Sequence, residues 1–118
     1  MKVVVIDDSA MVLDVVCAGL EARGYNAVPL DSPIGAGIVV TREKPDAVLV
    51  DLTMASMSGE AVVKSLKTAA PDGPRVVLFS DRQDADIALA AARSGADGWV
   101  RKGDMDRVAA ALAKAIGR

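Results

Sequence analysis

Carboxylate, hydroxyl and ammonium side chains follow short apolar runs at four places in the sequence. Asp7 and Asp8 follow the run at 3–6, Asp51 follows 47–50, Ser80 follows 76–79, and Lys102 comes shortly after 98–100. In open parallel α/β sheets, ligands bind beyond the carboxyl ends of the strands. If these runs are parallel strands of one sheet, the five side chains gather at one edge and form a candidate site.

The charges of these side chains predict a metal site. Three carboxylates facing one lysine carry a formal net charge of −2, which is costly unless protons or a cation are taken up. Oxygen ligands without His or Cys favour Mg²⁺, a hard cation that keeps some of its waters. A metal at this place would also neutralise an incoming phosphate.

The alternative is that these polar residues only cap the helices that follow the strands. We expect that role of Ser9 and Asp104, because Ser and Asp side chains accept bonds from free amides at helix starts. Asp7 and Asp8 together suit a cap poorly, since one side chain is enough and a second carboxylate adds repulsion. We therefore favour the clustered site.

Five apolar runs alternate with five helical patterns along the chain. Runs rich in β-branched residues are typical of strands buried on both faces of a parallel sheet, and they lie at 3–6, 25–30, 47–50, 76–79 and 98–100, the second being the weakest. Val12, Val16 and Leu20 share one face of a first helix, which is expected to stop at Gly24. Four more helices are expected at 34–43, 60–69, 83–94 and 105–116. Right-handed crossovers then predict an α/β fold with a five-stranded parallel sheet flanked by five helices. Residues 1–118 have the length of one domain.

The composition argues against several functional classes. A net charge of −2 with 3% aromatic residues lacks the basic surface on which nucleic-acid binding depends. No apolar run approaches the roughly 18 residues of a membrane span, and two carboxylates come too early for a signal peptide. We expect a cytoplasmic protein without direct contact to nucleic acid or membrane. The single Cys17 has no disulfide partner in the chain and is expected to serve packing.

Five ordered motifs resemble the response-regulator receiver family of two-component signalling, over essentially the whole chain. They are Val5-Ile6-Asp7-Asp8-Ser9, Val50-Asp51-Leu52-Thr53-Met54, Met57-Ser58-Gly59, Phe79-Ser80, and Gly95-Ala96-Asp97-Gly98-Trp99-Val100-Arg101-Lys102. The resemblance implies a CheY-like, flavodoxin-like (βα)5 fold. It also implies a signalling phosphoacceptor domain that catalyses only its own phosphorylation and dephosphorylation.

The same resemblance implies a role for each site residue. Asp51 would accept the phosphoryl group, while Ser80 and Lys102 would each contact one of its oxygens. Mg²⁺ would be held by Asp8, Asp51 and the main-chain carbonyl of Thr53, with Asp7 reaching it through water. The implied partners are a histidine kinase or phosphotransfer protein and an effector that binds the face formed by 83–94, 98–100 and 105–116. The chain would be a monomer or a weak homodimer.

Three positions depart from the family pattern. Lys102 is followed by Gly103 where relatives usually carry proline after a cis bond, and we expect a trans bond here because cis costs about 3 kcal/mol without proline. Ala55 stands where the loop after the acceptor commonly has proline. Asp81 replaces the usual Ala or Gly after the hydroxyl residue, and we expect it to act as a charged gate at the mouth of the site.

Trp99 stands where many relatives carry a Tyr or Phe that turns inward when the hydroxyl residue, here Ser80, moves toward the phosphoryl group. This position predicts a switch residue, and the alternative is a large core residue with no such role. The helix at 83–94 is mostly Ala, which suits an element that shifts at low energetic cost.

Three other functions compete with a phosphorylated receiver. A Rossmann-like nucleotide-binding protein would need a glycine-rich first turn, and this chain has Asp-Asp-Ser there. A metal-dependent hydrolase with an Asp nucleophile is disfavoured by the small size and by the lone Asp51 on the third run. A pseudo-receiver, which keeps the fold as a protein-interaction module without phosphorylation in the cell, remains the alternative because of Asp81 and the missing proline.

Overall fold

The computed structural model describes residues 1–117 and contains one sheet of five parallel strands. The strands are β1 (Lys2–Ile6), β2 (Asn26–Leu30), β3 (Ala47–Asp51), β4 (Arg75–Ser80) and β5 (Gly98–Arg101). The helices are α1 (Ala10–Glu21), α2 (Ala36–Glu43), α3 (Gly59–Ala69), α4 (Asp84–Ser94) and α5 (Met105–Ile116). The predicted α/β fold of five strands and five helices is confirmed.

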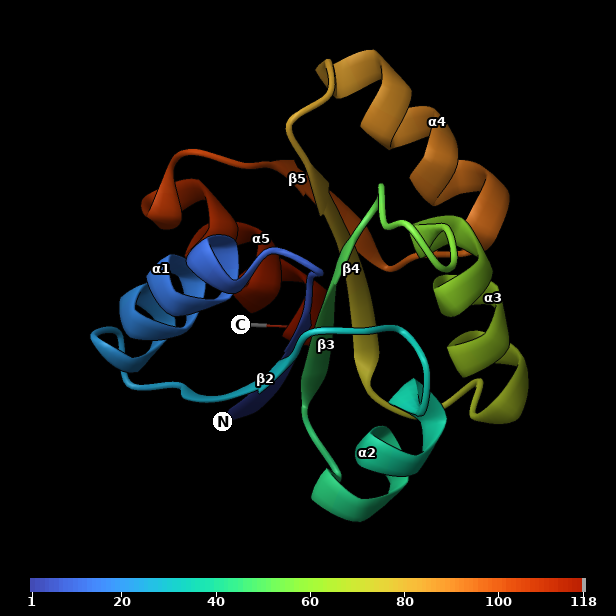
Figure 1. Ribbon diagram of the computed structural model, residues 1–118, viewed down its shortest axis with the longest axis horizontal. Coiled ribbons are helices and arrows are strands. Elements are labelled where there is room, and N and C mark those ends of the chain that lie inside the picture. Colours follow the sequence, from blue (N-terminus) through green and yellow to red (C-terminus); the bar gives the residue numbers. More distant parts are fainter. Residues whose placement is uncertain (118) are drawn as a thin grey trace.

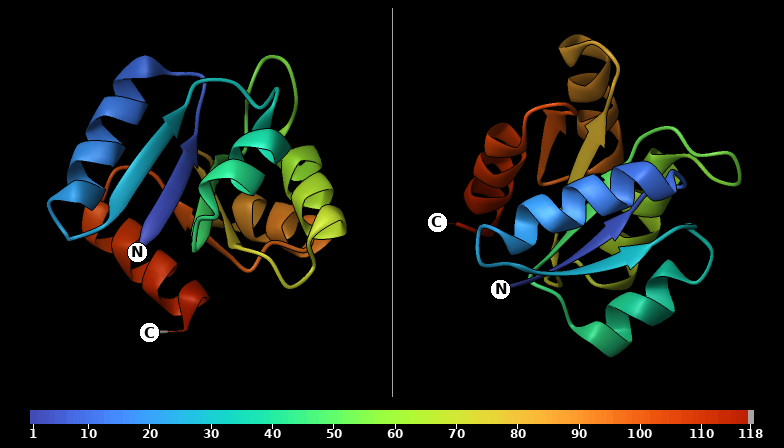
Figure 2. Two further views of the ribbon diagram at one scale, coloured as in Figure 1. Left: turned by 90° about the horizontal axis from the view of Figure 1, so that it is seen from below. Right: turned by 60° about the vertical axis from the view of Figure 1, so that its left-hand side comes forward.

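Helices cover both faces of the sheet, with α1 and α5 on one face and α2, α3 and α4 on the other (Figures 1 and 2). Successive side chains of a strand point to opposite faces, so each central strand contributes to two cores. Val3, Val5 and Leu49 pack with α1 and α5. Val4 and Val50 pack with the three helices of the other face. This two-sided burial explains why the strands read as unbroken apolar runs.

The strand order is β2-β1-β3-β4-β5. β2 therefore lies on one side of β1, whereas β3, β4 and β5 follow one another on its other side. The order reverses between β1 and β3, and a crevice forms at such a point beyond the carboxyl ends of the strands. Residues that follow β1 and end β3 consequently flank a natural binding position.

Two helix boundaries differ from the sequence prediction by more than one residue. The first helix ends at Glu21 rather than continuing to Gly24, because Arg23 and Gly24 donate to the carbonyls of Leu20 and Glu21 and tighten the turn. Gly24 does adopt a left-handed conformation, with φ of 87°. The second helix begins at Ala36, since Gly35 before it has φ of 81° and interrupts the helical backbone.

Within residues 1–117, no helix is long and apolar enough to cross a membrane.

Candidate functional site

The ends of β1, β3, β4 and β5 bring the predicted site residues into one cavity of about 460 Å³. Each residue is placed by its strand, because Asp51 and Ser80 end β3 and β4, whereas Asp7 and Lys102 directly follow β1 and β5. The lining comprises Asp7, Asp8, Ser9, Val12, Asp51, Thr53, Ser80, Asp81, Arg82 and Lys102. All six residues named for phosphoryl and metal contacts from the sequence thus lie around a single space.

Lys102 is the buried cation of this cavity. Its Nζ lies 2.7 Å from Asp7 Oδ2 and 3.1 Å from Asp51 Oδ1, and 4.7 Å from the centroid of the Phe79 ring. Burial by itself lowers the pKa of Lys102, but the hydrogen bond to Asp7 and the charges of Asp51 and Asp7 raise it more. The net pKa is raised, so the lysine is a permanent positive charge between two carboxylates.

Asp51 is only 5% exposed, and its environment makes ionisation costly. Burial raises the pKa of its carboxyl, the charge of Lys102 opposes this increase, and the charge of Asp7 adds to it. Lys102 and the backbone N–H of Thr53 both contact Oδ1, the latter at 3.4 Å. Within the described chain, Asp51 Oδ2 has no hydrogen-bond partner, so one oxygen is left to react or to bind a cation.

Asp7, Asp8 and Asp51 each offer an oxygen within 4.8 Å of the others. Asp7 is 1% exposed, and both of its oxygens are engaged, Oδ1 by the Ser9 N–H at 2.9 Å and Oδ2 by Lys102. Asp8 is exposed and uses only Oδ2, which accepts from the Ala55 N–H at 3.1 Å. Three carboxylates against one ammonium fit a hard divalent cation, with Asp8 and Asp51 offering the free oxygens.

The loop between β3 and α3 is fixed at its base by Gly59. A Cβ on this residue would overlap the carbonyl oxygen of Asp51 and lie 2.7 Å from Leu52 Cα, so only glycine fits there. The Gly59 N–H donates to the Leu52 carbonyl at 2.9 Å. Further along the loop, the Ala55 N–H donates to Asp8. Proline, which is common at this position in the family, has no N–H and could not form this bond.

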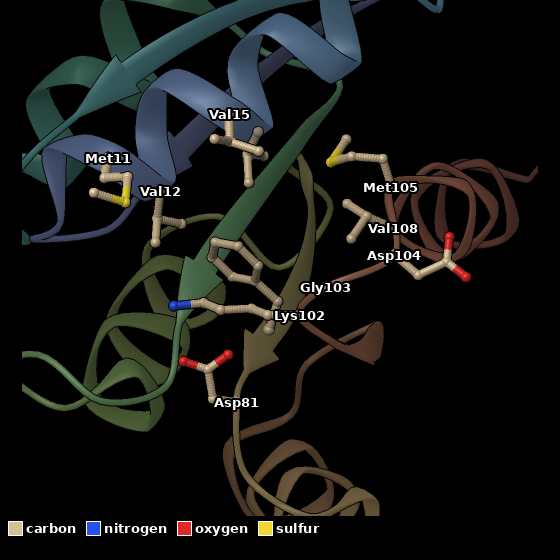
Figure 3. Close-up of a pocket in the computed structure, with 11 residues that line it drawn as sticks. Met11, Val12, Val15, Asp81, Lys102, Gly103, Asp104, Met105 and Val108 are labelled. Atoms are coloured by element: carbon tan, nitrogen blue, oxygen red, sulfur yellow. The ribbon is translucent and has the colours of Figure 1, made fainter.

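Ser80 and Asp81 end the β4 side of the cavity. The Ser80 side chain is buried, and its Oγ accepts from the Arg82 N–H at 3.1 Å, which leaves the hydroxyl hydrogen available to another acceptor. Asp81 is exposed and lies beside Lys102 at the edge of a second, apolar groove of about 260 Å³ between α1 and α5 (Figure 3). The described peptide bonds include no cis bond, so Lys102–Gly103 is trans, as expected.

Trp99 lies away from this cavity, in a groove between α4 and α5 that is lined mainly by alanines. The residue is 38% exposed. The interpretation of Trp99 as a core residue is therefore wrong. The ring lies on the face that α4, β5 and α5 share, where a change in its burial is physically accessible.

Two features of the site were absent from the sequence reasoning. The Asp8–Ala55 hydrogen bond joins residues far apart in sequence, and an alanine carries no side-chain signal for a backbone contact. Arg82 lines the acidic cavity as a second cation. Its position two residues after Ser80 was the available clue, because residues at the carboxyl end of a strand face the crevice.

A sheet of order β2-β1-β3-β4-β5, with helices on both faces and an acidic cluster beside a lysine at its carboxyl edge, defines a CheY-like domain. The chain belongs to the response regulator receiver domain family, which matches residues 3–113. It is thus a receiver domain of the two-component type.

Known relatives agree with this assignment. The chain is 34% identical to the transcriptional regulatory protein KdpE of Mycobacterium tuberculosis over 98% of its own length and 51% of KdpE, so it spans about half of that relative. A receiver domain from Clostridium thermocellum has 27% identity and a TM-score of 0.87, covering 99% of this chain and 94% of the other. A response regulator from Burkholderia pseudomallei, with a phosphorylated aspartic acid, calcium ion and citrate, has 28% identity and a TM-score of 0.82 over 94% and 65% of the two chains.

Proposed function

We propose that this receiver domain accepts a phosphoryl group on Asp51 in the presence of Mg²⁺, from a histidine kinase, a phosphotransfer protein or a small phosphodonor. The observation that carries the proposal is the buried Asp51 carboxylate, whose Oδ1 is held by Lys102 and whose Oδ2 has no partner among residues 1–117. The phosphorylated aspartic acid of the Burkholderia pseudomallei relative supports it.

In the proposed reaction, Asp51 Oδ2 forms a bond to phosphorus while the bond to the donor's leaving group breaks, and the leaving group keeps the electron pair. Lys102 and the Ser80 hydroxyl each stabilise one phosphoryl oxygen, since positioning and charge neutralisation supply most of the catalysis in such transfers. Asp8, Asp51 and the Thr53 carbonyl would hold Mg²⁺, with Asp7 behind them through water. Bound Mg²⁺ would offset the negative charge of the carboxylates and the incoming group.

The decisive experiment is the intact mass of the protein after incubation with acetyl phosphate and MgCl₂. Wild type should gain one phosphoryl mass, and Asp51→Asn should gain none, because no other carboxylate in the cavity combines a free oxygen with contact to Lys102. Labelling of the Asp51→Asn protein would contradict the assignment of Asp51 as the phosphoacceptor. Absence of labelling in wild type would favour the pseudo-receiver, for which Asp81 at the cavity mouth is the supporting observation.

The surfaces next to the site support a proposal for where partners bind. We expect a phosphodonor protein that reaches Asp51 to contact the apolar groove between α1 and α5 as well, because Val12, Asp81 and Lys102 line both spaces (Figure 3). An effector protein or domain is expected on the face formed by α4, β5 and α5. Phosphorylation would change that face, and in this way the domain would signal without acting on a separate substrate.

Switching at that face should be visible in the fluorescence of Trp99, the only tryptophan. Because Trp99 is 38% exposed, we expect a spectral shift when beryllofluoride, a phosphoryl mimic, binds with MgCl₂. The Asp51→Asn protein serves as the control and should keep its spectrum. An unchanged wild-type spectrum, with mimic binding confirmed by fluorine NMR, would remove Trp99 from the switch.

Asp81→Ala should accelerate phosphorylation by acetyl phosphate, because an exposed carboxylate at the cavity mouth repels an anionic donor. Interactions between exposed charges are worth up to about 1 kcal/mol, so the gain should be at most roughly fivefold. It should shrink as NaCl is added, since salt screens exposed charges. Equal rates for the two proteins at low salt would refute the charged gate.

A further inference from the structure

Phe79 is the third neighbour of the Lys102 ammonium, beside two carboxylates. The centroid of its ring lies 4.7 Å from Lys102 Nζ, within the distance of about 6 Å at which the negative face of an aromatic ring attracts a cation. Phe79 is fully buried, and the Lys102 side chain is only 13% exposed. Water therefore screens this contact little, and such contacts are strongest when they are shielded from solvent.

The register of the sheet places the Phe79 ring on the path from Lys102 to Asp51. On β4, Phe79 is paired with Asp51 of β3 on one side and with Val100 of β5 on the other. Lys102 comes two residues after Val100, so its side chain leaves the chain on the same face of the sheet. To reach Asp51 it must cross the end of β4, and the ring lies at that crossing. The sheet itself therefore fixes the ring next to the ammonium.

A ring and a carboxylate hold an ammonium in different ways. Lys102 contacts charged oxygens of Asp7 and Asp51. Phosphorylation of Asp51 would turn its carboxylate into an uncharged acyl group and place the negative charge on the phosphoryl oxygens, so the ammonium would have to follow that charge. The ring attracts the ammonium through its quadrupole and carries no net charge. It can therefore hold Lys102 before and after the transfer without repelling an anionic donor.

We propose that Phe79 is a positioning residue for phosphorylation, because the face of its ring keeps the Lys102 ammonium where it can move from Asp51 to a phosphoryl oxygen. The proposal rests on the proposed function, since it presumes that Asp51 is phosphorylated. It adds an apolar residue to the polar set identified from the sequence. The alternative is that Phe79 only fills the core between the sheet and helices α1 and α5, in which case the charge distribution of its ring has no consequence.

The two roles can be separated because Phe79 is the only phenylalanine of the chain. Protein made with a fluorinated phenylalanine is therefore changed at this ring alone. Fluorine atoms on the outer edge of the ring withdraw electron density from its face and weaken its attraction for a cation, while the ring keeps its shape and stays apolar. Fluorination should thus destabilise a ring that holds an ammonium, whereas a ring that only packs should keep or gain stability.

The experiment compares proteins whose Phe79 ring carries no, one, two or three fluorine atoms, each in wild type and in Lys102→Met. Urea denaturation in EDTA gives the midpoint of unfolding, and intact mass after timed incubation with acetyl phosphate and MgCl₂ gives the phosphorylation rate of the wild-type series. Lys102→Met is the matched background, because the ring is present and only the ammonium is absent. Any effect of the larger size of fluorine appears equally in both backgrounds. Phe79→Leu, which removes the ring and keeps an apolar side chain, extends the series.

In wild type we expect the phosphorylation rate to fall about twofold with each fluorine, and by roughly tenfold in Phe79→Leu, because a shielded contact between a cation and a ring is lost. The urea midpoint should fall by about 0.5–1 M over the fluorine series. In Lys102→Met the midpoint should stay level or rise with fluorination, because no ammonium is left for the ring to attract.

A midpoint that stays level or rises in wild type, or that falls equally in the two backgrounds, would make Phe79 a packing residue. Falling midpoints with unchanged phosphorylation rates would limit the contact to stability. Either result overturns the positioning role of Phe79 and leaves the proposed function intact. If wild type itself takes no phosphoryl group, the proposed function and the positioning role are both overturned.

Discussion

Lys102→Met should lower the free energy of unfolding of the metal-free protein by about 3 kcal/mol at pH 7. The Lys102 ammonium lies within 3.1 Å of oxygens of both Asp7 and Asp51, which are 1% and 5% exposed. Without it, two buried carboxylates lack a counter-charge, and breaking a buried pair in this way is strongly destabilising. Methionine keeps an apolar side chain next to Phe79, so the loss reports the charge rather than a cavity.

The pH dependence of this loss follows from two pKa shifts. Burial lowers the pKa of Lys102, but the bond to Asp7 and the carboxylate charges raise it more, to above its ordinary value of 10.5. The stability from the ammonium is therefore fully present below about pH 10.5 and is lost as the pH rises through the folded-state pKa. On the acid side, burial has already raised the pKa of Asp51, and loss of the lysine raises it further. As the pH falls, protonation of Asp51 therefore removes one uncompensated charge from the variant, and the stability difference from wild type becomes smaller.

Urea denaturation of both proteins in EDTA, across the acid, neutral and alkaline ranges, measures this profile. The difference between wild type and Lys102→Met should be widest near neutral pH and should narrow on both sides. Arg93→Met is the matched control, because Arg93 pairs with Glu60 at 2.9 Å but stays exposed, and such pairs contribute little. Equal losses in the two variants, or a Lys102→Met loss independent of pH, would mean that burial of the charges is not the cause.

The order of strands and helices was predictable because independent local signals agree. Val3–Ile6 of β1 and Ala47–Val50 of β3 are buried on both faces, and these stretches are unbroken apolar runs. The ends of the elements were less certain. β3 and β4 include the polar residues Asp51 and Ser80, because their backbones continue the sheet after the apolar pattern has stopped. A side-chain pattern carries no information on such backbone pairing.

The gathering of site residues was also predictable, since strand ends of a parallel sheet share one edge. The different environments of Asp7 and Asp8 were not predictable from the residues themselves, although the family resemblance implied different roles for them at the metal. As neighbours with equal charge they look alike in sequence, yet one is buried against Lys102 and the other is exposed and bonded to Ala55. Those partners come from other parts of the chain, so the difference exists only in the folded protein. The exposure of Trp99 has the same origin, because the alanines beside it come from α4 and α5.

The inequality of the two carboxylates should appear directly in metal binding. Asp8→Asn should weaken Mg²⁺ binding by about 10-fold to 100-fold. Substitution of a residue that only supports a metal ligand already has an effect of this size, and a residue that coordinates the metal directly should matter at least as much. Asp8 Oδ1 is free of hydrogen bonds within the described chain, so this carboxylate can coordinate directly, and asparagine removes its charge. Asp7→Asn should weaken binding by less than about 10-fold, because both Asp7 oxygens already have partners and its charge is balanced by Lys102.

The stability of the metal-free variants should rank in the opposite order. Asp8→Asn should leave it level or raise it, because repulsion among the carboxylates falls and an amide oxygen can still accept from the Ala55 N–H. Asp7→Asn should lower it, because Lys102 loses the closer of its two buried partners. Calorimetric titration with MgCl₂ and urea denaturation in EDTA measure the two quantities on the same proteins. If Asp7→Asn lost as much Mg²⁺ affinity as Asp8→Asn, Asp7 would have to release Lys102 and coordinate the metal directly. A destabilised Asp8→Asn protein would instead make the bond between Asp8 and the β3–α3 loop a structural requirement of the fold.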